Sequence, residues 1–334
     1  MAGRATNEPS NYFAVGKQSA KDTEATAFHF IKHLDGTGFE IEEGIQSERE
    51  GGDGQEVGLR YKESISADGQ FIVNARPEIA ARAIAYALGA DTVSDPTLTA
   101  TVASGVAQEH LLTPTSTLPY LSVEQYFADQ IERVSNVQVE GITVEGEAGR
   151  PIKLTSAFAG GGTPYRRDVA SVLTATRETN PPLFFPRASF VIDGAGNTKI
   201  TKFKLDAKRN LDKDIRTTDL FREDVIGLNF DTDLEFTLKY EDKTLYDKIK
   251  YGSGSQIPLD LATGSIKVYA EKGTGTNFRF FEVTANLFDY TGARLNRLDP
   301  DGKTMYLDVT AMGRKSATHQ ITARILTASV GALV

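Results

Sequence analysis

Apolar and polar residues alternate along much of the chain with a period of two, the pattern of β-strands that bury one face. The alternation is clearest in Phe39-Glu40-Ile41-Glu42 and from Asp231 to Phe236. Further strands are predicted over residues 59–73, 134–147, 151–158, 189–192, 198–205, 228–238, 264–270, 278–290 and 304–310. We therefore expect a mainly β protein, built from β-sandwich or β-barrel units.

Two helices are predicted among these strands. Arg76-Pro77-Glu78 begins the first, because proline suits the first turn of a helix and glutamate suits its positive end. Its apolar stripe consists of Ile79, Ala80, Ala83, Ile84, Ala87 and Leu88, and Gly89 ends it. Glu241-Asp242 begins a shorter helix that Gly252 ends. Each β unit is thus expected to carry one flanking α-helix.

The order of the elements recurs, which predicts a tandem duplication of one unit. Aligned positions carry residues of similar type: Phe71 and Leu234, Val73 and Phe236, Gly89 and Gly252, Leu154 and Leu307. Any two α+β domains can be matched loosely, but here a long charged loop precedes the strand and helix in both halves. The predicted division is an N-terminal arm (1–27), a first repeat (28–160), a linker (161–187), a second repeat (188–319) and a C-terminal arm (320–334).

The two charged loops, Gly44–Gly58 and Asp206–Asp224, occupy equivalent places in the repeats. Hairpin loops commonly have about two to five residues, so long ones without catalytic residues are typical of contact arms. Their charged residues include Glu48, Arg49, Glu50, Asp53, Arg209, Asp212, Lys213 and Asp214.

Acidic residues gather on single faces of two predicted strands. Glu40 and Glu42 lie opposite Phe39 and Ile41, and a second set lies opposite Leu234 and Phe236: Asp231, Asp233 and Glu235. Because both faces of such strands cannot be in the core, these carboxylates are expected to face water. Ordinary solubility is the simplest explanation for either cluster.

Composition narrows the possible functions. The 37 basic and 45 acidic residues give a net charge of −8, which argues against a sequence-reading nucleic-acid protein. The absence of cysteine excludes disulfides, thiolate metal sites and cysteine nucleophiles. No apolar run reaches the roughly 18 residues of a membrane span, and residues 1–11 lack the apolar core of a signal peptide. We expect a chain made and folded in a cytosol, without a membrane anchor.

Motifs for chemistry are weak. His29 and His33 are spaced like a helical metal pair, but Phe28 and Phe30 favour a strand. Gly302-Lys303-Thr304 resembles the end of a phosphate-binding loop, but Arg297 stands where that motif needs a glycine. We therefore predict no catalytic residue, no cofactor, no metal and no enzyme.

Several segments carry motifs of one protein family. They are residues 33–40 (HLDGTGFE) followed by a long loop, a strand and the helix at 75–80 (ARPEIA), then residues 145–155 (EGEAGRPIKLT), 209–212 (RNLD) and 242–247 (DKTLYD). In this arrangement, which spans roughly Phe28 to Ala328, the chain resembles tail tube proteins of long-tailed bacteriophages, of a duplicated-domain type.

The resemblance implies that strands of neighbouring subunits join into an inner β-barrel, and that rings stack into the tube of a virion tail, assembled in the host cytoplasm. DNA would pass through the lumen during genome ejection without specific binding. Six single units usually make a ring, so two tandem units imply a trimer with pseudo-sixfold symmetry. Tape measure, baseplate and terminator proteins are the implied partners.

The resemblance also gives roles to the singled-out residues. The carboxylates Glu40, Glu42, Asp231, Asp233 and Glu235 become candidates for the lumen wall, although Lys202 and Lys204 interrupt an acidic surface. The two long loops become candidates for contacts between rings. Two alternatives remain: a related baseplate or tail-terminator ring protein, and a carbohydrate-binding β-protein, against which the lack of tryptophan argues.

Overall fold

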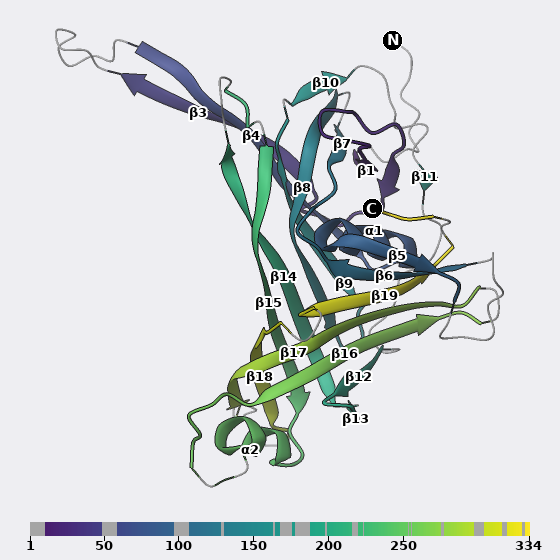
Figure 1. Cartoon of the computed structure of the whole chain (residues 1–334), viewed down its shortest axis with the longest axis vertical. Coiled ribbons are helices and arrows are strands. Elements are labelled where there is room, and N and C mark those ends of the chain that lie inside the picture. The colour runs from purple at the N-terminus through teal and green to yellow at the C-terminus, as the bar shows by residue number, and fades with distance from the viewer. Residues whose placement is uncertain are drawn as a thin grey trace.

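The mainly β prediction is confirmed by the structure, a computed structural model. It describes residues 11–48, 59–96, 107–127, 130–162, 164–167, 176–177, 188–197, 199–215, 220–222, 224–252, 254, 256–274, 277–296, 304–315, 319–328 and 331–334. Within these ranges almost all strand pairs are antiparallel, the pair between β2 and β11 being parallel. Figure 1 shows long, twisted strands that run the length of the molecule.

One eight-stranded sheet, which we name the long sheet, runs through both halves of the chain. Each strand in it pairs with the next: β3 (Gly38–Glu48), β4 (Leu59–Asn74), β9 (Lys153–Gly160), β8 (Gln130–Glu147), β14 (Ile200–Ile215), β15 (Asp224–Lys239), β18 (Tyr306–Gly313) and β17 (Arg279–Asn296). The first four strands come from the first half of the chain and the last four from the second half. The pair β8–β14 joins them.

The first and last parts of β8 and β17 belong to different layers. The first part of β8 pairs directly with β7 (Leu121–Phe127) and β10 (Tyr165–Arg167). The same layer continues in the first half through β1 (Asn11–Lys17), which pairs with β7, then β2 (His29–Ile31) and β11 (Thr176–Arg177), each of which pairs with the strand before it. In the second half the first part of β17 pairs directly with β16 (Thr263–Lys272) and β19 (Ile321–Thr327). That layer continues through β12 (Ala188–Ile192), which pairs with β16, and β13 (Ala195–Asn197), which pairs with β12.

The same pairings recur in the two halves, down to their irregularities. Pair by pair, β3-β4-β9-β8 corresponds to β14-β15-β18-β17, and β1-β7 to β12-β16. The bulge between Val139 and Gly141 of β8 returns between Tyr290 and Gly292 of β17, against equivalent partners. We name the two sets unit 1 (residues 11–167) and unit 2 (residues 188–327).

The register shows which residues are equivalent. The shared bulge makes Ser156 of β9 equivalent to Val309 of β18. Phe71 faces Ser156 and Phe236 faces Val309, so Phe71 corresponds to Phe236 and Val73 to Leu238. The sequence alignment of these strands was therefore wrong by two positions. The shift preserves the buried face, because side chains alternate with a period of two. The helix-ending glycines, Gly89 and Gly252, keep the expected correspondence.

The two helices form where they were predicted and differ in burial. Helix α1 (Pro77–Leu88) ends at Gly89, which has a left-handed φ of 96°, and nearly all of its side chains are buried. It packs against β8 and against β5 (Gly89–Ser94), β6 (Gln108–Pro114) and β19. Helix α2 (Thr244–Tyr251) lies at the lower end of the molecule in Figure 1, away from α1, and has no buried residue. Neither helix has the length and apolar character needed to cross a membrane.

Three predicted segments differ from the structure. Residues 11–17 of the expected N-terminal arm form β1, which buries Phe13 and Val15 between β2 and β7. The expected C-terminal arm contains β19, whose Ile321, Ala323 and Ile325 are buried. The region 90–119, for which no helix or strand was predicted, contains the β5–β6 hairpin, which adds to unit 2 by pairing with β19. Most of the expected linker lies outside the described residues.

Candidate functional site

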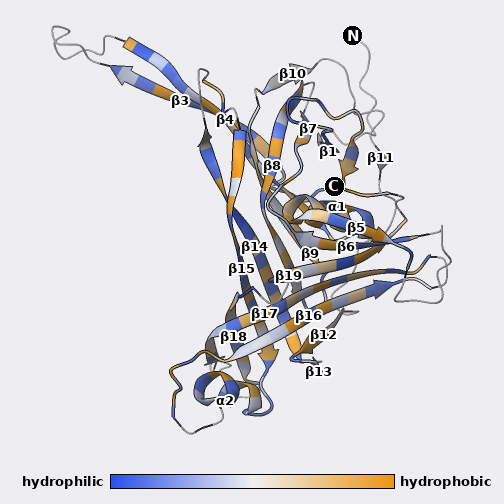
Figure 2. Ribbon diagram, in the orientation of Figure 1, coloured by the Kyte–Doolittle hydropathy of each residue, from blue (hydrophilic) through white to orange (hydrophobic). Residues whose placement is uncertain are grey.

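One face of the long sheet is polar and faces solvent, while the opposite face forms the core. In β15, Leu234, Phe236 and Leu238 are buried, and the residues between them are exposed or half-buried. Figure 2 shows the same alternation of hydrophilic and hydrophobic residues along the long strands. Across the pairs the register carries this face from β3 to β17. The five predicted carboxylates, Glu40, Glu42, Asp231, Asp233 and Glu235, all lie on it.

Basic side chains are interleaved with these carboxylates. The ammonium group of Lys204 lies 2.7 Å from Asp206, and the hydrogen bond between them raises the pKa of Lys204. Lys208 lies 3.9 Å from Asp233, and Lys153 lies 2.8 Å from Glu145. The wall is therefore mixed, with acidic residues more numerous than basic ones. Its charged residues are Glu40, Glu42, Asp68, Glu145, Glu147, Asp206, Asp231, Asp233, Glu235, Asp308, Lys153, Lys202, Lys204, Lys208, Lys239 and Arg294.

The junction between the units, which we name the closed joint, is the antiparallel pair β8–β14. Its register runs without interruption from Lys202 opposite Glu147 to Lys208 opposite Gly141. On the polar face Thr143 donates a hydrogen bond of 2.5 Å to Asp206, the residue directly opposite. On the other face Leu205 and Val144 are buried. The closed joint thus combines a backbone ladder, a polar contact and an apolar seam.

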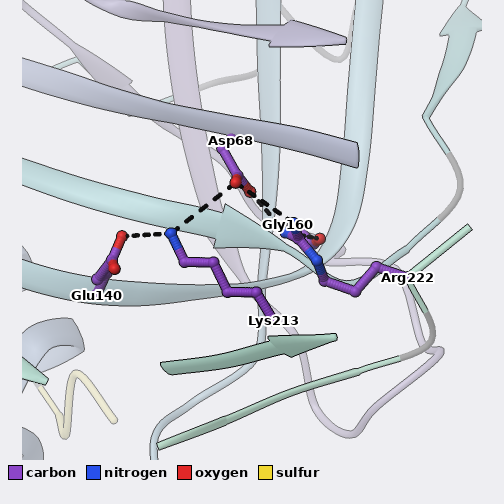
Figure 3. A network of polar contacts seen from close by, with 5 residues as sticks. All are labelled: Asp68, Glu140, Gly160, Lys213 and Arg222. Atoms are coloured by element: carbon purple, nitrogen blue, oxygen red, sulfur yellow. Dashed lines mark hydrogen bonds and ion pairs between the residues drawn. The ribbon is translucent and has the colours of Figure 1, made fainter. Parts of the chain in front are cut away.

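Beyond this ladder, the β14–β15 hairpin folds onto unit 1 through a network of charges (Figure 3). Lys213 lies 2.7 Å from Glu140 and 3.9 Å from Asp68. Arg222 is buried, lies 2.6 Å from Asp68 and donates to the carbonyl of Gly160 over 3.1 Å. The backbone N–H of Ile65 also donates to Leu220 over 2.8 Å. The second charged segment therefore holds the two units of one chain together.

The two segments expected to be long loops, Gly44–Gly58 and Asp206–Asp224, both begin as strand in the residues that the structure describes. Residues 44–48 continue β3, and the β3–β4 hairpin projects from the body of the molecule (Figure 1). Glu48 lies exposed at the end of β3, whereas Arg49, Glu50 and Asp53 lie outside the described residues. The β3–β4 hairpin carries exposed apolar side chains, namely Ile45, Leu59 and Tyr61.

The candidates on the other hairpin have different environments. Arg209 is 4% exposed, and its guanidinium lies 5.5 Å from the ring of Phe230, so its expected role in contacts between rings is wrong. Lys213 is engaged within the chain, as described above. Asp212 is exposed, and Asp214 belongs to β14 with a side chain outside the description. Because much of this segment is a strand packed within its own chain, it buries charged side chains such as Arg209 that a free loop would expose.

The long sheet ends in two edges that have no strand partner among the described residues. One is β3, which pairs with β4 alone, and the other is residues 292–295 of β17, which pair with β18 alone. At the β3 edge the side-chain amide of Gln125 accepts a hydrogen bond of 3.0 Å from the backbone N–H of Phe39. The same amide donates a hydrogen bond of 2.9 Å to the backbone carbonyl of Phe39. A hollow lined by Glu40, Asp68, Gln70 and Gln125 runs beside this edge. Neither Gln125 nor Arg294 was a candidate from the sequence, because only the fold brings them to an edge.

Groups that suggest catalysis do not form an accessible site. His110 lies 2.9 Å from Asp91 and 3.0 Å from the hydroxyl of Thr327, but the side chains of His110 and Asp91 are fully buried. Asp91 also accepts the N–H of Leu333 over 2.8 Å, so the group ties the β5–β6 hairpin to the end of the chain. Within the part of the chain that is described, no cluster of His, Asp and Glu forms a metal site. Lys303 and Gly302 lie outside that part.

These features define a mainly β protein whose largest sheet has a solvated, charge-rich face and two unpaired edges. A family model described as phage tail tube protein matches residues 11–277, so the chain belongs to the phage tail tube protein family. The search of curated proteins found no match to it. Family membership makes this chain a structural component of a bacteriophage tail in the virion, one that assembles into a tube with other tail components, and it favours a non-enzymatic role.

Proposed function

We propose that three copies of this chain form a closed ring in which the long sheets join edge to edge, and that rings stack into the tail tube. The observation that carries the proposal is the recurrence of one four-stranded unit within a single sheet, already joined once at β8–β14 and open at both ends. A closing rotation repeats the same contact until no free edge is left. Two such units in each chain give the trimer pseudo-sixfold symmetry.

The tandem duplication is part of this proposal. Shared topology, shared register and a shared bulge support the division of the chain into unit 1 and unit 2. The closed joint then serves as the internal version of the contact between subunits. The β5–β6 hairpin, which has no counterpart in the described residues of unit 2, adds its edge to β19 of unit 2 and fixes one unit against the other. Arg324 strengthens that contact through a hydrogen bond of 2.8 Å to Glu109.

In the ring, the polar face of the long sheet lines the lumen and the opposite face stays in the core. Because acidic residues outnumber basic ones on this face, DNA phosphates meet net repulsion. Of the lysines of β14 on this face, Lys204 is paired with Asp206 and Lys208 with Asp233, which leaves these two weak as phosphate sites. DNA can therefore pass during ejection without specific binding.

The β3–β4 hairpin is the proposed contact between successive rings. It projects beyond the body of the molecule and presents Ile45, Leu59 and Tyr61 to solvent. Exposed apolar residues grouped on one projecting element are typical of interaction surfaces. The tape measure, baseplate and terminator proteins of the tail are the partners proposed for the lumen and the two ends of the tube.

Electron microscopy of the purified chain over a range of concentrations tests this function. We expect hollow rings and tubes whose length grows with concentration, because both ring faces of a tube protein accept another ring. A single ring that never stacks would favour a terminator role instead. Monomers at all concentrations, with the thermal unfolding of a folded protein, would contradict the proposal.

A further inference from the structure

We infer that the open edge of β3 pairs with the open edge of β17 of a second copy in one defined register, which places Glu40 directly opposite Arg294. The inference rests on the ring proposed above and specifies its contact. The partner is a second copy of this chain, and the surface is the pair of unpaired edges at the ends of the long sheet.

The register follows from the closed joint by internal correspondence. In the closed joint Asp206 of β14 lies opposite Thr143 of β8. Because Phe71 corresponds to Phe236, Asp68 of β4 corresponds to Asp233 of β15. Glu40 pairs with Asp68 and Asp206 pairs with Asp233, so Glu40 is the unit 1 equivalent of Asp206. Thr143 faces Thr155 as Arg294 faces Asp308, so Arg294 is the unit 2 equivalent of Thr143. Replacing each strand by its equivalent turns the closed joint into a pair between Glu40 and Arg294.

The direction of the backbone groups at the β3 edge agrees with this register. Gln125 binds both the N–H and the carbonyl of Phe39, so these groups point away from β4 and toward the open edge. In an antiparallel ladder each residue directs both groups to the same side, and neighbours alternate. Phe39 and Ile41 therefore offer their backbone groups to a partner, and Glu40 occupies a non-hydrogen-bonded position. Side chains at such positions approach most closely across the strands.

The side chains at the two edges are complementary. Glu40 and Arg294 are exposed on the same polar face and carry opposite charges. Neither forms an ion pair with another residue that the structure describes. On the core side Ile41 is 39% exposed at the β3 edge, and Ala293 and the half-buried Leu295 lie along the β17 edge. Pairing would cover this apolar seam, as Leu205 and Val144 are covered in the closed joint.

Gln125 has no counterpart in unit 2, which agrees with its place at an open edge. Glu132 of β8 is equivalent to Val283 of β17, because the bulges of these strands align. Gln125 pairs with Glu132 and Val268 pairs with Val283, so the unit 2 equivalent of Gln125 is the buried Val268. At the closed joint the backbone of β14 has a strand partner, and no amide is needed there. In the free chain Gln125 supplies the hydrogen bonds that β17 of the second copy supplies in the ring.

Disulfide trapping tests the register, and the absence of native cysteine removes background. The test variant carries Glu40→Cys and Arg294→Cys in the full chain, oxidised under assembly conditions. We expect disulfides between chains that yield covalent dimers and closed trimers on a denaturing gel. A shifted variant, Glu42→Cys with Arg294→Cys, places the two Cα atoms about 7–8 Å apart on the diagonal, too far for a disulfide. It should give about tenfold less product.

Two controls make the result interpretable. Thr143→Cys with Asp206→Cys places the pair in the closed joint, where oxidation should give a disulfide within one chain. A charge exchange, Glu40→Arg with Arg294→Glu, should restore the assembly that either single reversal weakens by about tenfold. Thermal unfolding of each variant before oxidation identifies any that fail to fold.

The outcomes separate this inference from the proposed function. Rings that form without the expected disulfide, or that form the shifted one equally well, would overturn the register and leave the ring standing. A wild-type chain that forms no ring at all would overturn both. Covalent trimers from the Glu40–Arg294 pair alone support both.

Discussion

In the proposed ring the closed joint and the two open edges are equivalent contacts, one made within the chain and one made between copies. At β8–β14 a continuous ladder, the Thr143–Asp206 hydrogen bond and the charge network around Asp68 hold the units together. At the β3 edge one glutamine amide takes the place of a strand, and Ile41 is partly exposed. If the duplication proposed above holds, the closed joint serves as a template for the contact between subunits.

The largest expected effect comes from blocking the open edge alone. In Ile41→Pro the lost N–H points toward the edge and not toward β4, so the hairpin should stay folded. Ring and tube formation should be lost, because proline removes a ladder hydrogen bond and its ring meets the incoming strand. Electron microscopy shows whether the variant forms rings and tubes, and thermal unfolding shows whether it is folded. Normal tubes from this variant would show that β3 is not an assembly edge.

Equivalent core positions should respond alike in the two units. Phe71 and Phe236 are each 2% exposed and correspond in register. Replacing either by alanine should lower the free energy of unfolding by about 3–5 kcal/mol. Denaturant unfolding of the two variants measures it. An unchanged stability for either one would argue against the correspondence of β4 and β15.

Shortening the two hairpins should separate their roles. Joining Ile45 to Lys62 by an Asn-Gly turn should leave the monomer stable and shift the product from tubes to single rings. An equivalent shortening of β14–β15 removes Lys213 and Arg222 and leaves Asp68 without its cations, so the monomer itself should lose about 1–3 kcal/mol. Long tubes from the first variant would refute the role given to the β3–β4 hairpin.

Removing the amide that covers the β3 edge should make assembly faster. Gln125→Leu keeps the size of the side chain and frees the N–H and carbonyl of Phe39. Because each of these hydrogen bonds contributes about 1 kcal/mol, the assembly rate should rise by up to about tenfold. Light scattering gives the lag time, and Glu132→Gln, which keeps the amide in place, is the matched control. A longer lag for Gln125→Leu would contradict its role at the edge.

The smallest expected effect is a dependence of the unfolding free energy on pH that His29 gives to unit 1 and that unit 2 lacks at the equivalent position. Burial, followed by the charge of Arg82, lowers the pKa of His29 from 6.5 to about 4. Because the folded state disfavours the proton, the stability this group contributes is complete above about pH 6.5 and is lost as the pH falls toward 4. Unit 2 has Ala195 at the equivalent position. His29→Gln should reduce the loss of unfolding free energy between pH 6.5 and 4 by about 1 kcal/mol, and equal losses in both proteins would contradict it.

Local patterns were enough to predict much of this fold. The alternation around Glu40 and Asp231 gave the correct faces, and Pro77, Gly89 and Gly252 gave the limits of the helices. The strand β19 was missed although Ile321, Ala323 and Ile325 alternate with polar residues. The alignment error at Phe71 arose because the two units differ in length next to this strand. From the end of β15 to the end of α2 the chain is two residues shorter than from the end of β4 to the end of α1.

The site depended on contacts that no local pattern contains. Arg222 reaches Asp68 across more than 150 residues, and the sequence shows only two charges in separate segments. Arg209 was predicted to be a cation of a free loop because the sequence does not show that it lies opposite Phe230 in the β14–β15 pair. The importance of Gln125 and Arg294 depends on which edges are left unpaired, a property of the whole sheet. Sequence reasoning supplied the faces of the strands, and topology supplied the edges.

The central claim is that each chain supplies two of six equivalent units to a ring. End-on electron microscopy images of assembled tubes, analysed for rotational symmetry with the number of chains counted from the mass per ring, test it most directly. We predict three chains per ring, with a strong sixfold component and a weaker threefold component that arises from the β5–β6 hairpin of unit 1. Rings of six chains, or rings without a sixfold component, would contradict the account.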